Sequence, residues 1–143
     1  MKPLEIFETR LRDWADLRSR VANLPLDQTC DSINRWWFQH PWCPYRLHWD
    51  DQATWPDPWL LLEEPAFCDL ARGLGIMYTI AMLDRPDLQS CFLLEDKTHN
   101  LVLVHAEKYI LNYSADNILN TSLDISKNKK RKLTLAELKT QIR

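Results

Sequence analysis

Three residues of this 143-residue chain have the types and the order of a thiol-nucleophile triad. Cys68 lies in the first turn of a predicted short helix, His99 begins a predicted strand, and Asn112 ends the next strand. Helix amides favour a thiolate, an imidazole can take its proton, and an amide carbonyl can orient the imidazole. The pattern predicts that Cys68 is a nucleophile, with His99 as base and then acid, and Asn112 as the orienting residue. His105 lies six positions along the same strand and on the same face, so it is the alternative base.

The elements that must position these residues begin with two predicted helices. Apolar residues recur at steps of three and four from residue 4 to residue 21, which is the pattern of an amphipathic helix. A second helix is expected over residues 27–38. Residues 39–58 contain four prolines and six of the chain's tryptophans lie between Trp36 and Trp59, so we expect an ordered loop here.

The second half of the chain is expected to form a sheet. Residues 76–83 are a mainly apolar run after Gly75 and predict a buried strand. Residues 91–95, 99–105 and 108–112 predict three more strands joined by short polar turns. The helix that carries Cys68 would end at Gly75 and cover one face of this antiparallel sheet. The fold class is therefore α+β, with Cys68 and His99 expected within hydrogen-bond reach.

The order of these motifs resembles the transglutaminase-like fold, which has a papain-like cysteine protease core. The nearest branch is the bacterial transglutaminase-like cysteine peptidases. The resemblance covers residues 55–115 and rests on a Trp/Pro segment at 55–59, the box Phe67-Cys68-Asp69-Leu70-Ala71, the strand opened by His99, and the strand that ends at Asn112. It implies a thiol hydrolase or acyltransferase that acts on peptide or glutamine-type amides without a metal or an organic cofactor.

Two departures from the family pattern affect the predicted site. Ala66 and Phe67 replace the Gly-Asp pair that precedes the cysteine in the family, and Asn112 replaces an acid. An asparagine carbonyl can orient an imidazole, but it supports an imidazolium less than a carboxylate does. An active, a weakened and an inactive site all stay open, and Cys68 could equally be a small core residue.

The overall composition is that of an ordinary globular protein of one domain with a real core. Hydrophobic residues make up 45%, charged residues 27%, and the net charge is −2. No stretch approaches the roughly 20 apolar residues of a membrane span, and the N-terminus lacks the apolar run of a signal peptide. We therefore expect a cytoplasmic protein, which could also be incorporated into a particle. Its four cysteines are expected to be free thiols: Cys30, Cys43, Cys68 and Cys91.

The C-terminal segment differs from the rest of the chain in its charge. Residues 1–125 are predicted to form the single domain, and residues 126–143 a basic linker with a short docking helix. Five of the six positions from 127 to 132 are basic, and a capping-box pattern at Thr134 opens a helix with one apolar side: Leu135, Leu138 and Ile142. We expect this arm to lie outside the core and to meet acidic protein groups, with phosphate contact or a solvated linker as alternatives.

A second function hypothesis starts from the tryptophans. The residues between Trp36 and Trp59 could pin a proline-rich loop to the core, stack on bases or sugars, or anchor a protein interface. The chain could thus be a catalytically inactive structural protein of a larger assembly, such as a phage particle component. It would dock through this region and through residues 127–143, with no membrane contact and with nucleic acid touched only by the basic tail.

Two kinds of cofactor site are not expected. The two glycines, Gly73 and Gly75, are not followed by the rest of a phosphate-binding pattern. Four residues have the chemistry of zinc ligands: Cys30, His40, Cys43 and His48. Only the pair His40 and Cys43 has tight spacing, whereas structural zinc sites usually combine two such pairs, so no metal is predicted.

Overall fold

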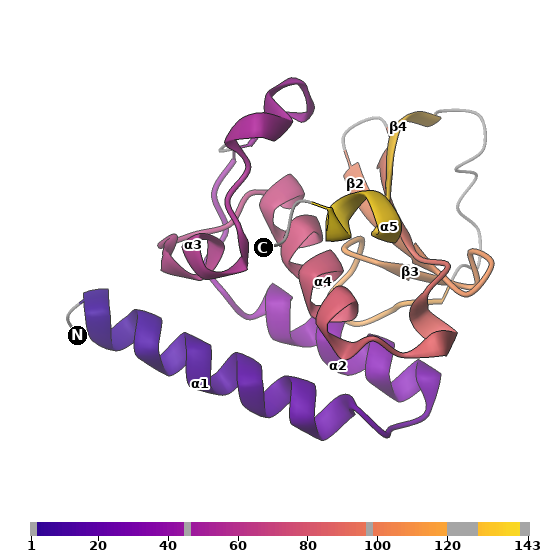
Figure 1. The fold of residues 1–143 in the computed structure, drawn as a ribbon, viewed down its shortest axis with the longest axis horizontal. Coiled ribbons are helices and arrows are strands. Elements are labelled where there is room, and N and C mark those ends of the chain that lie inside the picture. Colours follow the sequence, from indigo (N-terminus) through magenta and orange to yellow (C-terminus); the bar gives the residue numbers. More distant parts are fainter. Residues whose placement is uncertain (1–2, 45–46, 97–98, 120–128, 141–143) are drawn as a thin grey trace.

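The computed structural model describes residues 3–44, 47–96, 99–119 and 129–140 (Figure 1). Its helices pack on one face of a four-stranded antiparallel sheet, so the α+β class is confirmed. The helical elements are α1 (Pro3–Val21), α2 (Leu26–Phe38), η1 (Trp49–Thr54), α3 (Pro58–Glu63), α4 (Asp69–Leu83), η2 (Pro86–Leu88) and α5 (Leu135–Lys139). The strands are β1 (Phe92–Asp96), β2 (His99–Val104), β3 (Tyr109–Leu111) and β4 (Lys129–Thr134).

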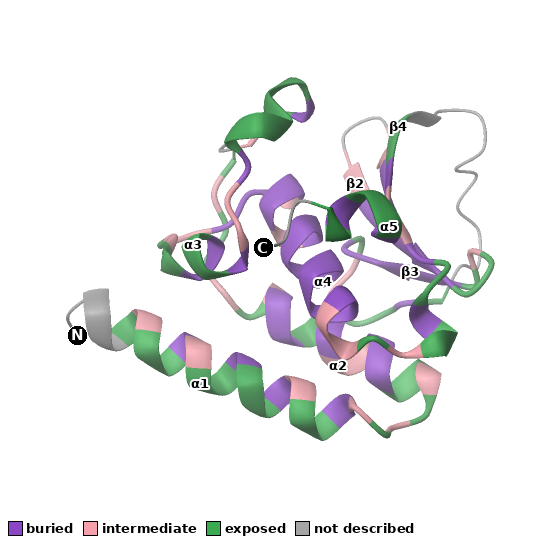
Figure 2. Ribbon diagram, in the orientation of Figure 1, coloured by how far each residue is buried: buried purple, intermediate pink, exposed green. Residues whose placement is uncertain are grey.

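The central element is α4, which is buried along most of its length (Figure 2). It lies between the layer of α1 and α2 and the sheet, and it also contacts α3 and α5. Eleven of its 15 residues are buried. A helix enclosed in this way needs no polar face, so its sequence after Arg72 is almost entirely apolar.

The predicted strand at residues 76–83 is wrong, because these residues form the second half of α4. A short, continuous apolar run fits a buried helix as well as a buried strand, and periodicity cannot separate the two. Gly75 does not end the helix either. It lies inside α4, where a Cβ would come within 2.4 Å of the Trp37 ring. The helix ends instead at Asp84, which has a left-handed backbone with φ 50°.

We expect Gly75→Ala to destabilise the protein, although alanine favours helices more than glycine does. The added methyl group would overlap the buried Trp37 ring, and overpacking of this kind costs about 1–3 kcal/mol. Urea denaturation measures the change in the free energy of unfolding. Gly73→Ala is the control from the same helix, because the contacts of its added methyl group, 2.9 Å to the end of the flexible Leu93 side chain and 3.0 Å to Asn112 Nδ2, are longer than those of Gly75. A larger loss in the control would contradict this account.

The sheet has the strand order β3-β2-β1-β4. The strands predicted near residues 91–95, 99–105 and 108–112 are confirmed as β1, β2 and β3. In the register, Glu95 lies opposite Asn100, and Asp96 lies opposite His99. Because paired residues share a face and successive residues alternate, two buried clusters result. One faces α4 and includes Leu93, Val102 and Leu111, and the other contains Leu94, Leu101, Leu103 and Ile110.

The prediction that the C-terminal segment lies outside the core is also wrong for the residues described. Strand β4 pairs with β1, and α5 packs against α4. Leu133 and Leu135 are each 2% exposed, and Leu138 is fully buried. The capping box between Thr134 and Glu137 is confirmed. Basic residues suit β4 because charged side chains on an edge strand discourage its pairing with another chain. The apolar residues that follow complete the core.

Other residues of the predicted arm, among them Lys127 and Ile142, lie outside the described ranges.

The tryptophans divide into two groups. Of the six tryptophans from Trp36 to Trp59, four are buried: Trp36 and Trp37 on α2, and Trp49 and Trp55 in the predicted loop. Trp49 and Trp55 pin the loop to the core, as one alternative held. Trp42 and Trp59 remain 59% and 43% exposed.

Candidate functional site

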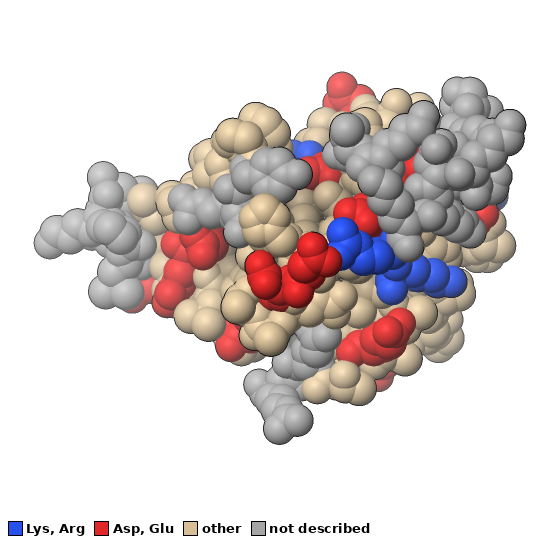
Figure 3. Space-filling view, turned by 90° about the horizontal axis from the view of Figure 1, so that it is seen from above, with Lys and Arg blue, Asp and Glu red and all other residues tan. Residues whose placement is uncertain are grey.

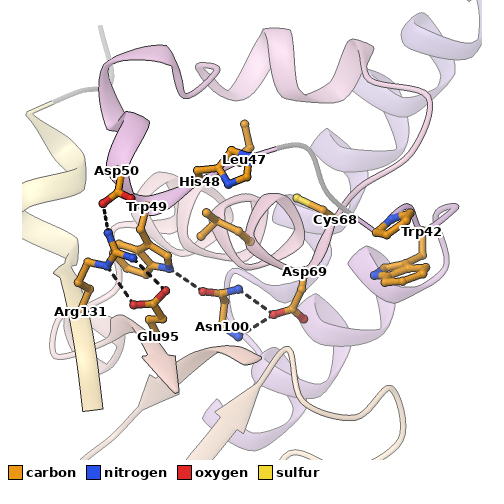
Figure 4. Close-up of a pocket in the computed structure, with 12 residues that line it drawn as sticks. Trp42, Leu47, His48, Trp49, Asp50, Cys68, Asp69, Glu95, Asn100 and Arg131 are labelled. Carbon is orange, nitrogen blue, oxygen red and sulfur yellow. Dashed lines mark hydrogen bonds and ion pairs between the residues drawn. The ribbon is translucent and has the colours of Figure 1, made fainter. Parts of the chain in front are cut away.

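Cys68 lies at the N-cap of α4, at the side of a pocket of about 260 Å³ (Figure 4). Its extended backbone (φ −76°, ψ 172°) begins the helix, and Sγ accepts a hydrogen bond from the Ala71 amide at 3.4 Å. The residue is only 3% exposed. The structure therefore places the predicted nucleophile at a helix start, as the sequence indicated. It also places Cys68 beside a pocket, but leaves little of the residue accessible.

The pocket has an apolar rim and a polar wall. Trp42, Pro44 and Leu47 form the apolar side near Cys68. The polar wall combines three carboxylates with a guanidinium, an imidazole and a carboxamide: Asp50, Asp69, Glu95, Arg131, His48 and Asn100. Seen from above, acidic side chains occur at several places on the face drawn in Figure 3.

His99 is not brought to Cys68. In β2 the side chain of Asn100 points to the start of α4, so its neighbour His99 lies on the opposite face of the sheet. The His99 ring is 5.2 Å from the ring of Tyr113, and His99 does not line the pocket. The predicted contact between Cys68 and His99 is therefore absent from this structure. The inward-facing residues of β2 begin one position later than the prediction required.

Asn112 lies near the start of α4, but its side chain is engaged by other partners. Its Nδ2 donates to the carbonyl oxygens of Asp69 at 2.8 Å and Asn100 at 2.6 Å. Its Oδ1 accepts from Arg72 Nε at 2.6 Å, and its backbone has φ 68°, which asparagine tolerates well. Asn112 thus joins the end of β3 to α4 and β2, and the bonds described for it hold the fold together.

Asn100, the neighbour of His99 in β2, is the residue whose side chain reaches the start of α4. Its Oδ1 accepts from Trp49 Nε1 at 2.7 Å, and its Nδ2 donates to Asp69 Oδ2 at 3.0 Å. The backbone amide of Asn100 also donates to Asp69 Oδ2, at 2.6 Å. Arg72 Nη2 lies 3.4 Å from Asp69 Oδ1. Burial lowers the pKa of Arg72, whereas the interaction with Asp69 raises it, and burial is the larger cause.

Sequence reasoning missed this role of Asn100 for a physical reason. The residues that follow it, Leu101 to Val104, are all apolar and all buried, because β2 is covered on both faces. Such a strand shows no alternation from which the inward face could be deduced. Asn100 is the polar residue next to His99, and only its pairing with Glu95 on β1 identifies it as the one that faces α4.

Arg131 brings the C-terminal strand to the same pocket. Its guanidinium donates to Glu95 through Nε at 2.9 Å and Nη2 at 3.3 Å, and it also donates to Asp50 on η1. The hydrogen bonds to Glu95 and Asp50 raise the pKa of Arg131, with that to Glu95 the larger cause. The guanidinium carbon lies 5.9 Å from the Trp49 ring. Sequence reasoning had placed Arg131 in a linker.

The four residues weighed as zinc ligands lie in different surroundings. Cys30 is fully buried in α2, where burial raises the pKa of its thiol to about 12. The ring of His40 lies 4.4 Å from that of Trp36, and burial lowers the pKa of His40 to about 4. His48 lines the Cys68 pocket. Within the described ranges, no three His, Cys, Asp or Glu side chains are grouped to hold a metal ion.

In the described part of the chain, no helix has both the length and the apolar character that crossing a membrane requires. Comparison with protein-family models, curated proteins and solved structures found no match for this chain.

Proposed function

We propose that this protein is a non-hydrolytic docking domain of a larger protein assembly, on a scaffold that resembles the transglutaminase-like fold. One observation carries the proposal: the β2 residue that faces the start of α4 is Asn100 and not a histidine. A carboxamide does not take up a proton at neutral pH, so it cannot serve as the general base for Cys68. The contacts of Asn100 with Trp49 and Asp69 also occupy both ends of its carboxamide.

Docking would use the large apolar side chains that remain exposed. Trp42 stands at the rim of the Cys68 pocket, and Trp59 and Leu60 (53% exposed) lie side by side on α3. Tryptophan is enriched among the residues that contribute most to protein interfaces. The expected partner is another protein of the assembly, whose side chain would enter the pocket next to Trp42.

Site-specific photo-crosslinking in the cells that naturally make the protein tests this docking role. A photoreactive phenylalanine analogue at position 42 is expected to give one dominant crosslinked protein. The matched control carries the analogue at position 19, which is exposed on α1. Equal crosslinking patterns from the two positions would count against a docking surface at Trp42.

A second candidate function is amide hydrolysis with the Cys68 thiol as nucleophile and His48 as the base. The observation that favours it is that Cys68 and His48 line the same pocket (Figure 4). In this scheme His48 removes the thiol proton, Cys68 Sγ forms a thioester with the acyl group, and the leaving amine takes that proton. Water then hydrolyses the thioester and restores the thiol.

The rate at which iodoacetamide alkylates Cys68 at pH 7 separates the two functions. For a docking domain we expect Cys68 to react more slowly than the half-buried Cys43, and His48→Ala to change the rate less than about twofold. A hydrolase would show preferential alkylation of Cys68 and a loss of about tenfold or more in His48→Ala, because general bases contribute at least that much. Peptide mass spectrometry assigns the modified cysteine.

A further inference from the structure

We infer that Arg131 is a latch that holds η1 against the sheet and thereby limits access to Cys68. The inference deepens the proposed function, since it concerns the same pocket, and it rests on that function for its biological use. Arg131 connects three segments that are distant in sequence: η1 through Asp50, β1 through Glu95, and its own strand β4. All three meet at the pocket that Cys68 lines.

The segment that the latch holds projects from the body of the protein (Figure 1). Residues 50–54 of η1 are exposed, whereas Trp49 at its start and Trp55 just after it are buried. Trp49 donates to Asn100, and Trp55 donates to the His48 carbonyl at 2.8 Å. Arg131 adds the bond to Asp50 beyond Trp49, so it ties down the exposed part of the segment as well as its buried start.

The charges explain why this contact would decide between a closed and an open pocket. Asp50 and Glu95 are both directed to the Arg131 guanidinium, whose fork can serve both carboxylates at once. Without that cation, two carboxylates would face each other across the pocket mouth, and like charges at short range repel. Loss of the arginine should therefore replace an attraction between η1 and the sheet with a repulsion.

The contact is also weak enough to open. The side chain of Asp50 is 85% exposed and that of Arg131 is 42% exposed. Exposed ion pairs contribute modestly and are weakened by salt, so local opening of η1 should be measurable under native conditions. An open η1 would enlarge the space next to Trp42 and admit a partner side chain to the pocket.

The rate at which a neutral aromatic disulfide labels Cys68 in the full-length protein measures this opening. We expect Arg131→Gln to accelerate Cys68 labelling by about 3–10-fold, the range for loss of a modest ion-pair network. The rates at Cys30 and Cys91, which are buried elsewhere, should stay unchanged. In the unmodified protein, 1 M NaCl should accelerate Cys68 labelling, and this salt effect should be lost in Arg131→Gln.

Asp50→Asn is the second test variant, because it removes the negative charge, and with it the ion pair, from a side chain that is 85% exposed. Arg12→Gln removes an exposed arginine of α1 and serves as the matched control, with no change expected. An unchanged rate of Cys68 labelling in Asp50→Asn would overturn the latch. This holds even if Arg131→Gln unfolds the protein globally and so accelerates the labelling of every cysteine. Because labelling needs no partner, a failure of crosslinking at position 42 would disprove docking without deciding the latch.

Discussion

Replacement of Thr79 by valine is expected to lower the free energy of unfolding by about 2–6 kcal/mol. The Thr79 hydroxyl accepts hydrogen bonds from the indole groups of Trp14 at 2.9 Å and Trp37 at 3.0 Å, and it donates to the Gly75 carbonyl. Valine has nearly the same shape but cannot accept, so it would leave two buried N–H groups without a partner. Each such group costs about 1–3 kcal/mol.

The effect should be large because Thr79 is a shared contact of three helices. Trp14 comes from α1 and Trp37 from α2, while Thr79 itself is on α4, and all three side chains are at most 1% exposed. Thr79→Ser keeps the hydroxyl and loses one methyl group, so a loss of about 1 kcal/mol is expected. Urea denaturation followed by tryptophan fluorescence measures both variants. Equal losses in the two variants would show that the hydroxyl is not the important group.

Deletion of residues 129–143 is expected to leave the chain unfolded. The deletion removes strand β4 and helix α5, including the buried side chains of Leu133, Leu135 and Leu138. Each buried leucine contributes about 1.5–3 kcal/mol, so three contribute roughly 5–9 kcal/mol. That amount is comparable to the whole stability of a typical domain, which is about 5–15 kcal/mol. Circular dichroism and thermal melting measure the outcome.

A single substitution tests the same point without removing the backbone. Leu138 is fully buried, so Leu138→Ala should cost about 2–5 kcal/mol. Lys139→Ala, at the next and exposed position of α5, should cost less than about 1 kcal/mol. A truncated protein that melts like the full chain would restore the view that this segment is a separate docking arm.

The sequence predicted the elements with a strong local signal. Helix α1 follows from its apolar periodicity, and the start of α5 follows from the capping box at Thr134. The strands β1 to β3 follow from short apolar runs separated by polar turns. The placement of Cys68 at a helix start was also predictable, because the box around it begins a helix that local rules suffice to identify.

The candidate site was predictable only in part. Cys68 and Asn112 do lie near the start of α4, as their positions in the sequence indicated. The partner from β2 was misassigned because that strand is buried on both faces, so Asn100 and His99 could not be distinguished by pattern. Arg131 was assigned to a linker because a basic run resembles a solvated segment wherever its acidic partners are distant in sequence.

What the sequence alone determined was therefore the α+β class, most of the local elements, and the helix start that holds Cys68. The tertiary structure decided that residues 76–83 continue a central helix, that β4 completes the sheet, and that Asn100 faces the pocket. The physical reason is the same in each case. Local signals specify backbone conformation, whereas burial on all sides, strand register and ion pairing depend on segments that are brought together only by folding.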